Sequence, residues 1–252
     1  MTLPSAGPER VQLCGPLVIE RGGTRAEAGV RGRQARMLFG YLTLNRHRSC
    51  SRAELAYAIW GDAAPDAAGP DLNALVSKLR RALGHETIEG RSSLRLVLGP
   101  DALVDVEVAE KAAHKAESRV VLEDWTHAWG ASLSALFITE RVLLPGDDAD
   151  WIDERRAWLA EIHLRALEAH AAAALGTGGT ELNAAVRAAR RLIRLAPLRE
   201  NGYQILMHAL AAQGNVGEAL LVHAELSRLL REELGVPPSA ATQAVHQELL
   251  RG

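Results

Sequence analysis

Apolar and polar residues alternate near the N-terminus and recur at helical spacing further along the chain. Residues 11–20 alternate on both sides of Gly15-Pro16, which predicts two short strands joined by a tight turn. Apolar residues at helical spacing predict a first helix over residues 35–45. A second helix is predicted directly after Ser51, because Glu54 stands three residues on and completes a capping box.

A third helix and a hairpin follow. We expect the helix to begin with Asp71 as its N-cap and to stop at Gly84. Its apolar face consists of Leu72, Leu75, Val76, Leu79 and Leu83. Residues 87–98 alternate around a turn at residues 90–93, which predicts a β-hairpin. Strands, three helices and a hairpin are the element order of a winged helix, whose third helix and hairpin usually meet DNA.

From Asp105 onward the pattern is helical. The predicted breaks lie at residues 144–148, 176–179, 196–197, 214–215 and 235–238. Small and apolar residues at 185, 188, 192 and 195 recur 34 positions later, at 219, 222, 226 and 229, and this period in helix pairs is typical of TPR repeats. The predicted fold class is therefore mainly α: an α+β winged-helix domain at residues 9–107 and an all-helical, TPR-like domain at residues 108–252.

The polar face of the third helix carries the side chains that pair with bases and phosphates. Opposite the apolar stripe lie Asn73, Ser77, Lys78, Arg80 and Arg81, and there is no acidic residue between Leu72 and Gly84. Asn, Ser, Lys and Arg are the usual donors to base edges and to phosphate oxygens. The pattern favours DNA contact over the alternative, a merely solvated helix face.

Further arginines flank this helix. Arg91 and Arg95 stand in the hairpin, where wing residues can reach a minor groove or a phosphate. Arg31 and Arg33 precede the first helix, in a run from 31 to 52 that holds six arginines and no acid. We include all four arginines in the predicted DNA-binding set; the alternative is that they are solvated surface charges.

Composition restricts the function more than the fold. A formal net charge of −2 argues against indiscriminate coating of nucleic acid. The two cysteines have no CxxC spacing, which indicates a reduced, intracellular protein. The first residues lack the basic-then-apolar layout of a signal peptide, and no apolar stretch is long enough to cross a membrane. We therefore expect a cytoplasmic protein without membrane contact.

No motif for catalysis or metal binding emerges. His163 and His170 lie seven residues apart without an HExxH pattern, and we expect them to be surface or packing residues. The glycine-rich residues 176–180 lack the Lys-Ser/Thr of a phosphate loop. An acidic patch follows residue 146 and consists of Asp147, Asp148, Asp150, Asp153 and Glu154. It fits either a cation site or, as we prefer, the start of a helix. No cofactor, no metal and no enzymatic activity are expected.

Four stretches of the chain match one family. They are residues 32–62 (GRQARMLFGYLTLNRHRSCSRAELAYAIWGD), 72–84 (LNALVSKLRRALG), 196–220 (APLRENGYQILMHALAAQGNVGEAL) and 232–250 (EELGVPPSAATQAVHQELL). In this order and separation, they make the chain resemble the SARP family (Streptomyces antibiotic regulatory proteins). In that family an OmpR-like winged helix precedes a bacterial transcriptional activation domain. With their connectors, the matching stretches cover nearly the whole chain.

The resemblance implies a transcriptional activator that binds direct repeats of double-stranded promoter DNA and recruits RNA polymerase. It implies self-association on DNA and control of a secondary-metabolite gene cluster. Residues 72–81 would be the recognition helix and residues 90–95 the wing. The chain departs from the family where Ser92-Ser93-Leu94 replaces a Gly-Gly-Tyr-like wing element and where no aromatic residue follows Val104-Asp105. The alternative function is a TPR-like interaction protein, a co-regulator whose winged helix does not bind DNA.

Overall fold

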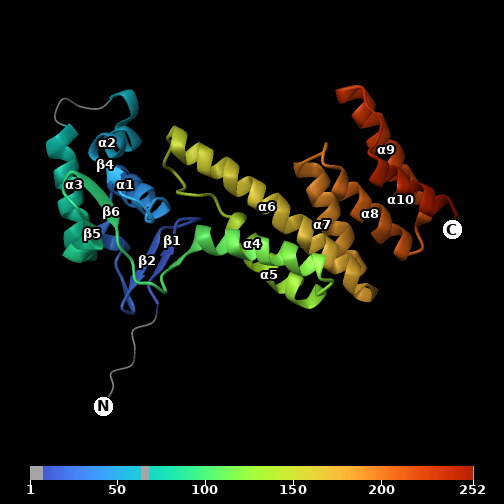
Figure 1. Cartoon of the computed structure of the whole chain (residues 1–252), viewed down its shortest axis with the longest axis horizontal. Coiled ribbons are helices and arrows are strands. Elements are labelled where there is room, and N and C mark those ends of the chain that lie inside the picture. The colour runs from blue at the N-terminus through green and yellow to red at the C-terminus, as the bar shows by residue number, and fades with distance from the viewer. Residues whose placement is uncertain (1–7, 64–67, 252) are drawn as a thin grey trace, which may run out of the picture. The chain divides into compact units, whose positions relative to one another are not determined.

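The computed structural model describes residues 8–63 and 68–251, which form two compact units (Figure 1). The first unit comprises residues 1–108 and 141–159, and the second comprises residues 109–140 and 160–252. Sequence patterns did not indicate that residues 141–159 belong with the first unit. The predicted boundary between a winged-helix domain at residues 9–107 and a TPR-like domain at residues 108–252 stays a prediction.

The first unit opens with a small sheet in the order β3-β2-β1-β7. Strand β1 (Arg10–Gln12) runs antiparallel to β2 (Val18–Arg21), which confirms the predicted pair, and β2 pairs with β3 (Thr24–Arg25). Strand β7 (Leu103–Val104) pairs in parallel with the other edge of β1. Val11 is opposite Ile19 on one side and Val104 on the other, and all three are buried.

Three helices follow this sheet in the chain and pack against one another. They are α1 (Arg33–Leu44), α2 (Arg52–Trp60) and α3 (Ala68–Leu83), with 3-10 turns η1 (Glu27–Gly29), η2 (Gly61–Ala63) and η3 (His85–Thr87) between elements. The capping box at the start of α2 is confirmed: the Ser51 hydroxyl accepts from the Glu54 amide, and the Glu54 carboxylate accepts from the Ser51 amide. The predicted start of the third helix at Asp71 is wrong. Helix α3 already includes Ala68, because a proline such as Pro70 fits the first turn of a helix.

The predicted hairpin is confirmed, and it has a third strand. Strand β5 (Ile88–Glu89) pairs with β6 (Ser93–Leu96), and β6 also pairs with β4 (Cys50–Ser51), a two-residue strand too short to show a sequence period. Gly90 turns the hairpin with a φ of +96°, and a Cβ there would lie 2.0 Å from the Ser93 carbonyl oxygen. Only glycine fits this position without moving the wing.

Residues 141–159 return to the first unit through buried contacts. Leu143 forms an isolated bridge with Cys14, and the buried Asp147 carboxylate accepts two hydrogen bonds from Arg36, at 2.7 and 2.8 Å. Asp105, at the start of α4 (Asp105–Val121), links another pair of distant segments within this unit: its carboxylate accepts hydrogen bonds from the backbone amides of Leu13 and Cys14 at 2.8–3.0 Å. Both links connect positions that are about a hundred residues apart in the chain.

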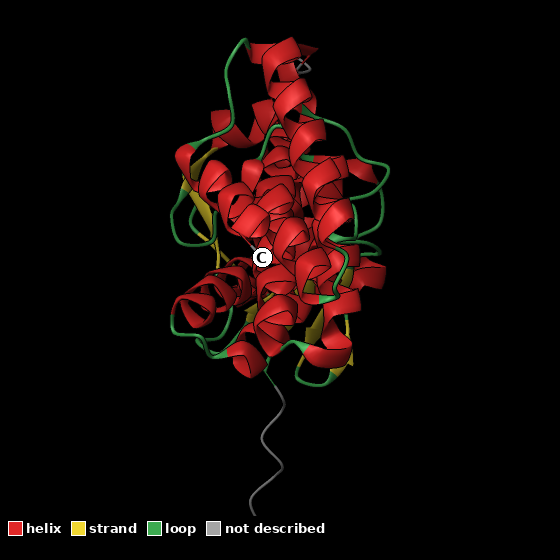
Figure 2. Ribbon diagram, turned by 90° about the vertical axis from the view of Figure 1, so that its right-hand side faces the viewer, coloured by secondary structure: helices red, strands yellow, loops and turns green. Residues whose placement is uncertain are grey.

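The remaining elements are helices, as the predominance of red ribbon in Figure 2 shows. They are α4 (Asp105–Val121), α5 (Trp125–Thr139), α6 (Asp150–Thr177), α7 (Leu182–Leu195), α8 (Glu200–Ala212), α9 (Val216–Leu234) and α10 (Ala240–Arg251), with the turn η4 (Gly179–Glu181) before α7. Helices α4 and α6 begin in the first unit. Breaks occur at all five predicted places, although α6 continues through Thr177, so the one predicted at residues 176–179 begins two residues later. Residues 122–124 form a sixth break that the sequence pattern did not indicate.

The repeat of helix pairs predicted for the C-terminal part is also present. Helix α8 packs against both α7 and α9, and α10 packs against α8 and α9. Ala185 and Leu192 of α7 are buried, as are their counterparts 34 residues on, Ala219 and Leu226 of α9. The 34-residue repeat of buried positions does not extend to Leu195, which is 53% exposed because it is the last residue of α7, beyond the packed stripe. The mainly α fold class, a winged helix followed by a TPR-like domain, is therefore confirmed.

Candidate nucleic-acid interface

Helix α3 presents one buried and one exposed face. Leu72, Val76, Leu79 and Leu83 are buried. On the other side Asn73, Ser77, Lys78 and Arg81 are exposed. The helix therefore offers two cations and two neutral polar side chains to solvent, in an arrangement suited to phosphates and base edges.

Arg80 differs from its neighbours, because it is half-buried and bonded within the protein. Its Nε donates to the Ile88 carbonyl at 3.0 Å, and its Nη2 donates to the carbonyls of Ile88 and Gly90 at 2.8 and 3.1 Å. These bonds fasten the hairpin to α3. The direct DNA contact predicted for Arg80 stays untested, and the bonds give this residue a second role, that of positioning the wing.

Arg52, at the start of α2, forms a second link between α3 and the hairpin. Its Nη2 donates to the Asn73 Oδ1 at 2.5 Å, and its Nη1 donates to the Arg91 carbonyl at 3.0 Å. Sequence reasoning did not place Arg52 in the site, although the acid-free arginine run that contains it was the available signal. Arg52 therefore orients Asn73, the α3 side chain best suited to pair with adenine.

The hairpin arginines differ from each other. Arg91 is exposed at the turn, whereas Arg95 forms an ion pair with Glu89 of the opposite strand, at 3.0 Å. An exposed pair of this kind contributes little to stability and is readily exchanged for another partner. Both residues remain predicted wing contacts.

Arg31 lies just before α1 and Arg33 is its first residue, and only Arg31 contacts α3. The Lys78 Nζ donates to the Arg31 carbonyl at 2.5 Å, and Gly29 lies so close to Ala82 that a Cβ there would be 2.3 Å from the Ala82 Cβ. Arg33 instead donates to the Asp148 carbonyl at 2.6 Å. Among the described contacts none joins Arg33 to α3 or to the hairpin, so its DNA contact stays a prediction without structural support.

The described residues also show what the other candidate groups do. His163 shares a hydrogen bond with the Thr139 hydroxyl, and His170 shares one with the Ser132 hydroxyl and lies against the Trp129 ring. Burial lowers the pKa of both imidazoles. Both histidines are packing residues, as predicted. In the described ranges no cluster of three or more His, Cys, Asp or Glu side chains has a geometry that holds a metal ion.

The cysteines and the acidic patch have structural surroundings. Burial raises the pKa of both thiols, Cys14 and Cys50, which keeps them protonated and unreactive. Asp150 and Asp153 lie in the first turn of α6, as the helix-start interpretation predicts. That interpretation is wrong for Asp147, which precedes the helix and is a buried partner of Arg36. None of the described helices is long and apolar enough to cross a membrane.

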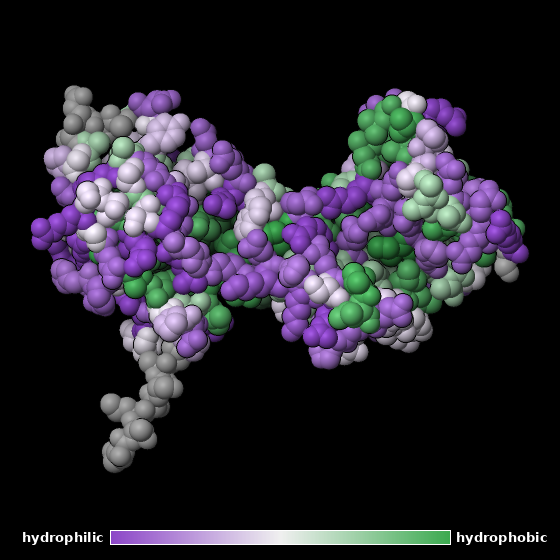
Figure 3. Space-filling model, viewed as in Figure 1, coloured by the Kyte–Doolittle hydropathy of each residue, from purple (hydrophilic) through white to green (hydrophobic). Residues whose placement is uncertain are grey.

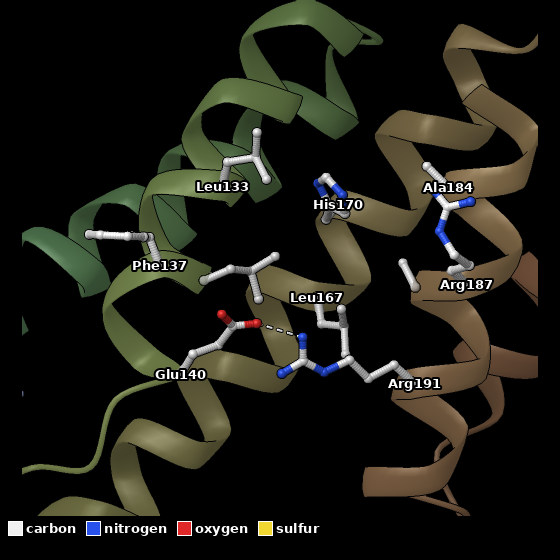
Figure 4. Close-up of a pocket in the computed structure, with 10 residues that line it drawn as sticks. Leu133, Phe137, Glu140, Leu167, His170, Ala184, Arg187 and Arg191 are labelled. Carbon is white, nitrogen blue, oxygen red and sulfur yellow. Dashed lines mark hydrogen bonds and ion pairs between the residues drawn. The ribbon is translucent and has the colours of Figure 1, made fainter. Parts of the chain in front are cut away.

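The second unit carries a shallow cavity of about 460 Å³ between α5, α6 and α7 (Figure 4). Leu133 and Leu136 of α5, Leu167 of α6 and Ala188 of α7 supply apolar walls. At its edge Arg191 forms an ion pair with Glu140, at 2.5 Å. Figure 3 shows further hydrophobic patches on the mainly hydrophilic surface of this unit.

Comparison with known proteins identifies relatives of the whole chain. Residues 104–250 match the family model of the bacterial transcriptional activator domain. The regulatory protein AfsR of Streptomyces griseus is 31% identical over 96% of this chain, and the transcriptional regulator RedD of Streptomyces coelicolor is 26% identical over 97% of it. The match covers 71% of RedD but 24% of AfsR, so the chain spans about a quarter of the length of AfsR.

A solved structure shares the fold. Mycobacterium tuberculosis EmbR, in complex with a low-affinity phosphopeptide, superimposes with a TM-score of 0.83 at 21% identity. The match covers 97% of this chain and 65% of that one. At this identity the likeness concerns the fold alone.

Proposed function

Because the chain belongs to the SARP family of regulators, which carry the bacterial transcriptional activator domain, we propose that it is a sequence-specific DNA-binding activator of transcription. In this proposal α3 enters the major groove and the β5–β6 hairpin contacts the neighbouring backbone or minor groove. The protein acts in the cytoplasm and is not an enzyme.

One observation carries the proposal: two half-buried arginines hold the exposed face of α3 in fixed relation to the hairpin. Arg80 ties the hairpin carbonyls to α3, and Arg52 ties Asn73 to the hairpin turn. Preorganised helix and wing lower the ordering cost of binding. Lys78, Arg81 and Arg91 remain exposed for phosphates and base edges.

The partners follow from the family. We propose that the protein binds direct repeats near a promoter, self-associates there, recruits RNA polymerase and switches on a secondary-metabolite gene cluster. Direct repeats require head-to-tail contacts between copies, not two-fold ones. With about four to six phosphate contacts per subunit, the slope of log K against log salt would be roughly −4 to −5.

The test is a titration of the purified chain against a fluorescent duplex from the promoter nearest its own gene, beside a scrambled duplex. We expect tight binding to the promoter that survives scrambled competitor. The Lys78→Ala, Arg81→Ala double variant should lose it, and the control Arg228→Ala, at an exposed arginine of α9, should keep it. Retained affinity in the double variant would contradict the assignment of α3.

A second candidate function is a protein-interaction co-regulator that does not bind DNA. The net charge of −2 and the Ser92-Ser93-Leu94 wing favour it. Equal, weak binding to both duplexes would support this function and exclude the first. Conversely, a footprint of the pure protein on its promoter would exclude the second.

A further inference from the structure

The first unit has a cavity in which aromatic side chains are concentrated. It measures about 620 Å³ and lies between α1, α2 and the start of α6, all within the same compact unit. Four aromatic side chains line it, Tyr41, Tyr57, Trp60 and Trp151, in a chain with only five Trp, three Tyr and two Phe. A volume of this size is typical of small-molecule sites.

Hydrogen bonds hold two of these rings in place. The Trp151 indole donates to the Ala58 carbonyl at 2.9 Å, and the Tyr41 hydroxyl donates to Glu54 at 2.7 Å. The two rings meet edge to face, with centroids 5.1 Å apart and planes at 88°. Burial, followed by the Glu54 carboxylate, raises the pKa of Tyr41 to about 12, so its phenol stays neutral. The corner is built and rigid, whereas Tyr57 is 57% exposed and able to adjust.

Carboxylates determine which ligand suits this cavity. Four line it, Glu54, Asp148, Asp150 and Glu154, against one guanidinium, Arg33. Glu54 is paired with Arg48 and Asp148 with Arg156, while Arg33 is bonded to the Asp148 carbonyl. Among the described residues Asp150 and Glu154 have no ion-pair partner. They lie one helical turn apart on α6, on either side of Trp151 in sequence.

We propose that this cavity is a binding site for a small organic cation, an amine or quaternary ammonium with an apolar body. The aromatic corner attracts the cation through its ring faces, and Asp150 and Glu154 supply the opposite charge. An anion is repelled by the same carboxylates. A bound cation would bridge the C-terminal half of α2 and the first turns of α6, which makes it an effector of the winged helix. Cation binding at this cavity does not require DNA.

The experiment is calorimetric titration of the full chain with benzyltrimethylammonium, beside benzyl alcohol and benzoate as neutral and anionic aromatic probes. We expect saturable binding of the cation alone. The Asp150→Asn, Glu154→Gln double variant should weaken it about fivefold to twentyfold, since an exposed charge pair contributes roughly twofold to fivefold. Tyr57→Ala should weaken it about twofold to fivefold through the lost ring contact.

The matched control is Asp153→Asn, which removes a carboxylate from the same helix turn outside the cavity, where it pairs with Arg156. It should bind the cation as the unaltered chain does. Indole N–H resonances, including that of Trp151, check that each variant keeps the pocket.

Four results would overturn the proposal. The first is that benzyl alcohol binds as tightly as the cation, and the second is that the double variant and Asp153→Asn bind the cation equally well. The third is that binding does not saturate at about 10 mM probe, tenfold above a Kd of about 1 mM. The fourth is that a lysine-rich peptide binds and the small cation does not. The last result would assign the cavity to a basic protein partner.

Discussion

The adjacent residues Arg80 and Arg81 allow one sharp test of α3 as the proposed recognition helix. Both carry one positive charge on α3, yet Arg80 makes three hydrogen bonds to hairpin carbonyls, and Arg81 is exposed. Replacing each separately with alanine removes the same charge from the same helix. The two variants therefore separate the structural role of an arginine from its role in the electrostatic field around DNA.

The magnitude for Arg80→Ala follows from its bonds. A hydrogen bond from a charged donor contributes about 1.5–3 kcal/mol. Two of the three bonds share the Ile88 oxygen and the group is half-buried, so we expect a total loss of about 2 kcal/mol in the free energy of unfolding. That corresponds to a Tm lower by roughly 4–8 °C. Arg81→Ala should change the free energy of unfolding by less than about 0.5 kcal/mol.

The salt dependence of DNA binding should rank the two variants in the opposite order, with the larger change for Arg81→Ala. In the proposed complex Arg81 contacts a phosphate, so Arg81→Ala should reduce the slope of log K against log salt by about 0.9. Arg80→Ala should weaken binding through a loosened wing and leave the slope unchanged. Urea unfolding and promoter titrations at several salt concentrations measure both quantities. Equal destabilisation by the two variants, or a larger change in slope for Arg80→Ala, would refute the reasoning.

Three further predictions concern stability. Asp105→Ala should lower the free energy of unfolding by about 3 kcal/mol in urea titrations, because it strands the buried amides of Leu13 and Cys14; a neutral result would show that these amides find other acceptors. The Arg48 guanidinium lowers the pKa of Glu54 to about 2 from its ordinary 4.5, so the ion pair stabilises the fold fully above pH 4.5 and is lost as the pH falls towards 2. The free energy of unfolding of Glu54→Gln should therefore be about 1 kcal/mol lower than that of the unaltered chain at pH 7, and the difference should shrink between pH 4.5 and pH 2. A difference that stays constant over this range would contradict the prediction. Gly176→Ala should lower the Tm of the second unit by several degrees in calorimetry, because its Cβ would lie 2.4 Å from the Trp125 ring, and an unchanged Tm would mean that the ring moves at no cost.

Features that depend on neighbours within a few residues were predicted from the sequence. The capping box of Ser51 and Glu54 needs only a three-residue spacing, and the hairpin around Gly90 needs only alternation and a turn. The buried stripe of α3 follows from a period of 3.6 residues. In each case the physical cause is local, so the pattern in the chain carries the whole signal.

Side-chain direction within the site was decided by tertiary structure. Successive residues on a helix point about 100° apart, so Arg80 and Arg81 share a polar face in the sequence yet meet different surroundings. Only the position of the hairpin carbonyls decides that Arg80 is bonded and Arg81 is exposed. The same applies to Arg52, whose partners Asn73 and Arg91 lie 21 and 39 residues further along the chain.

The sequence by itself therefore determined the order of the first strand pair, the three helices and the hairpin, the helix pairs with a 34-residue period and the cationic face of α3. Tertiary structure alone decided the pairing of β7 with β1, the burial of Asp147 under Arg36 and the aromatic cavity between α1, α2 and α6. Contacts such as that of Asp105 with Leu13 join residues 92 positions apart, and no periodicity links such positions. Their geometry exists only once the separate segments have packed around a shared core.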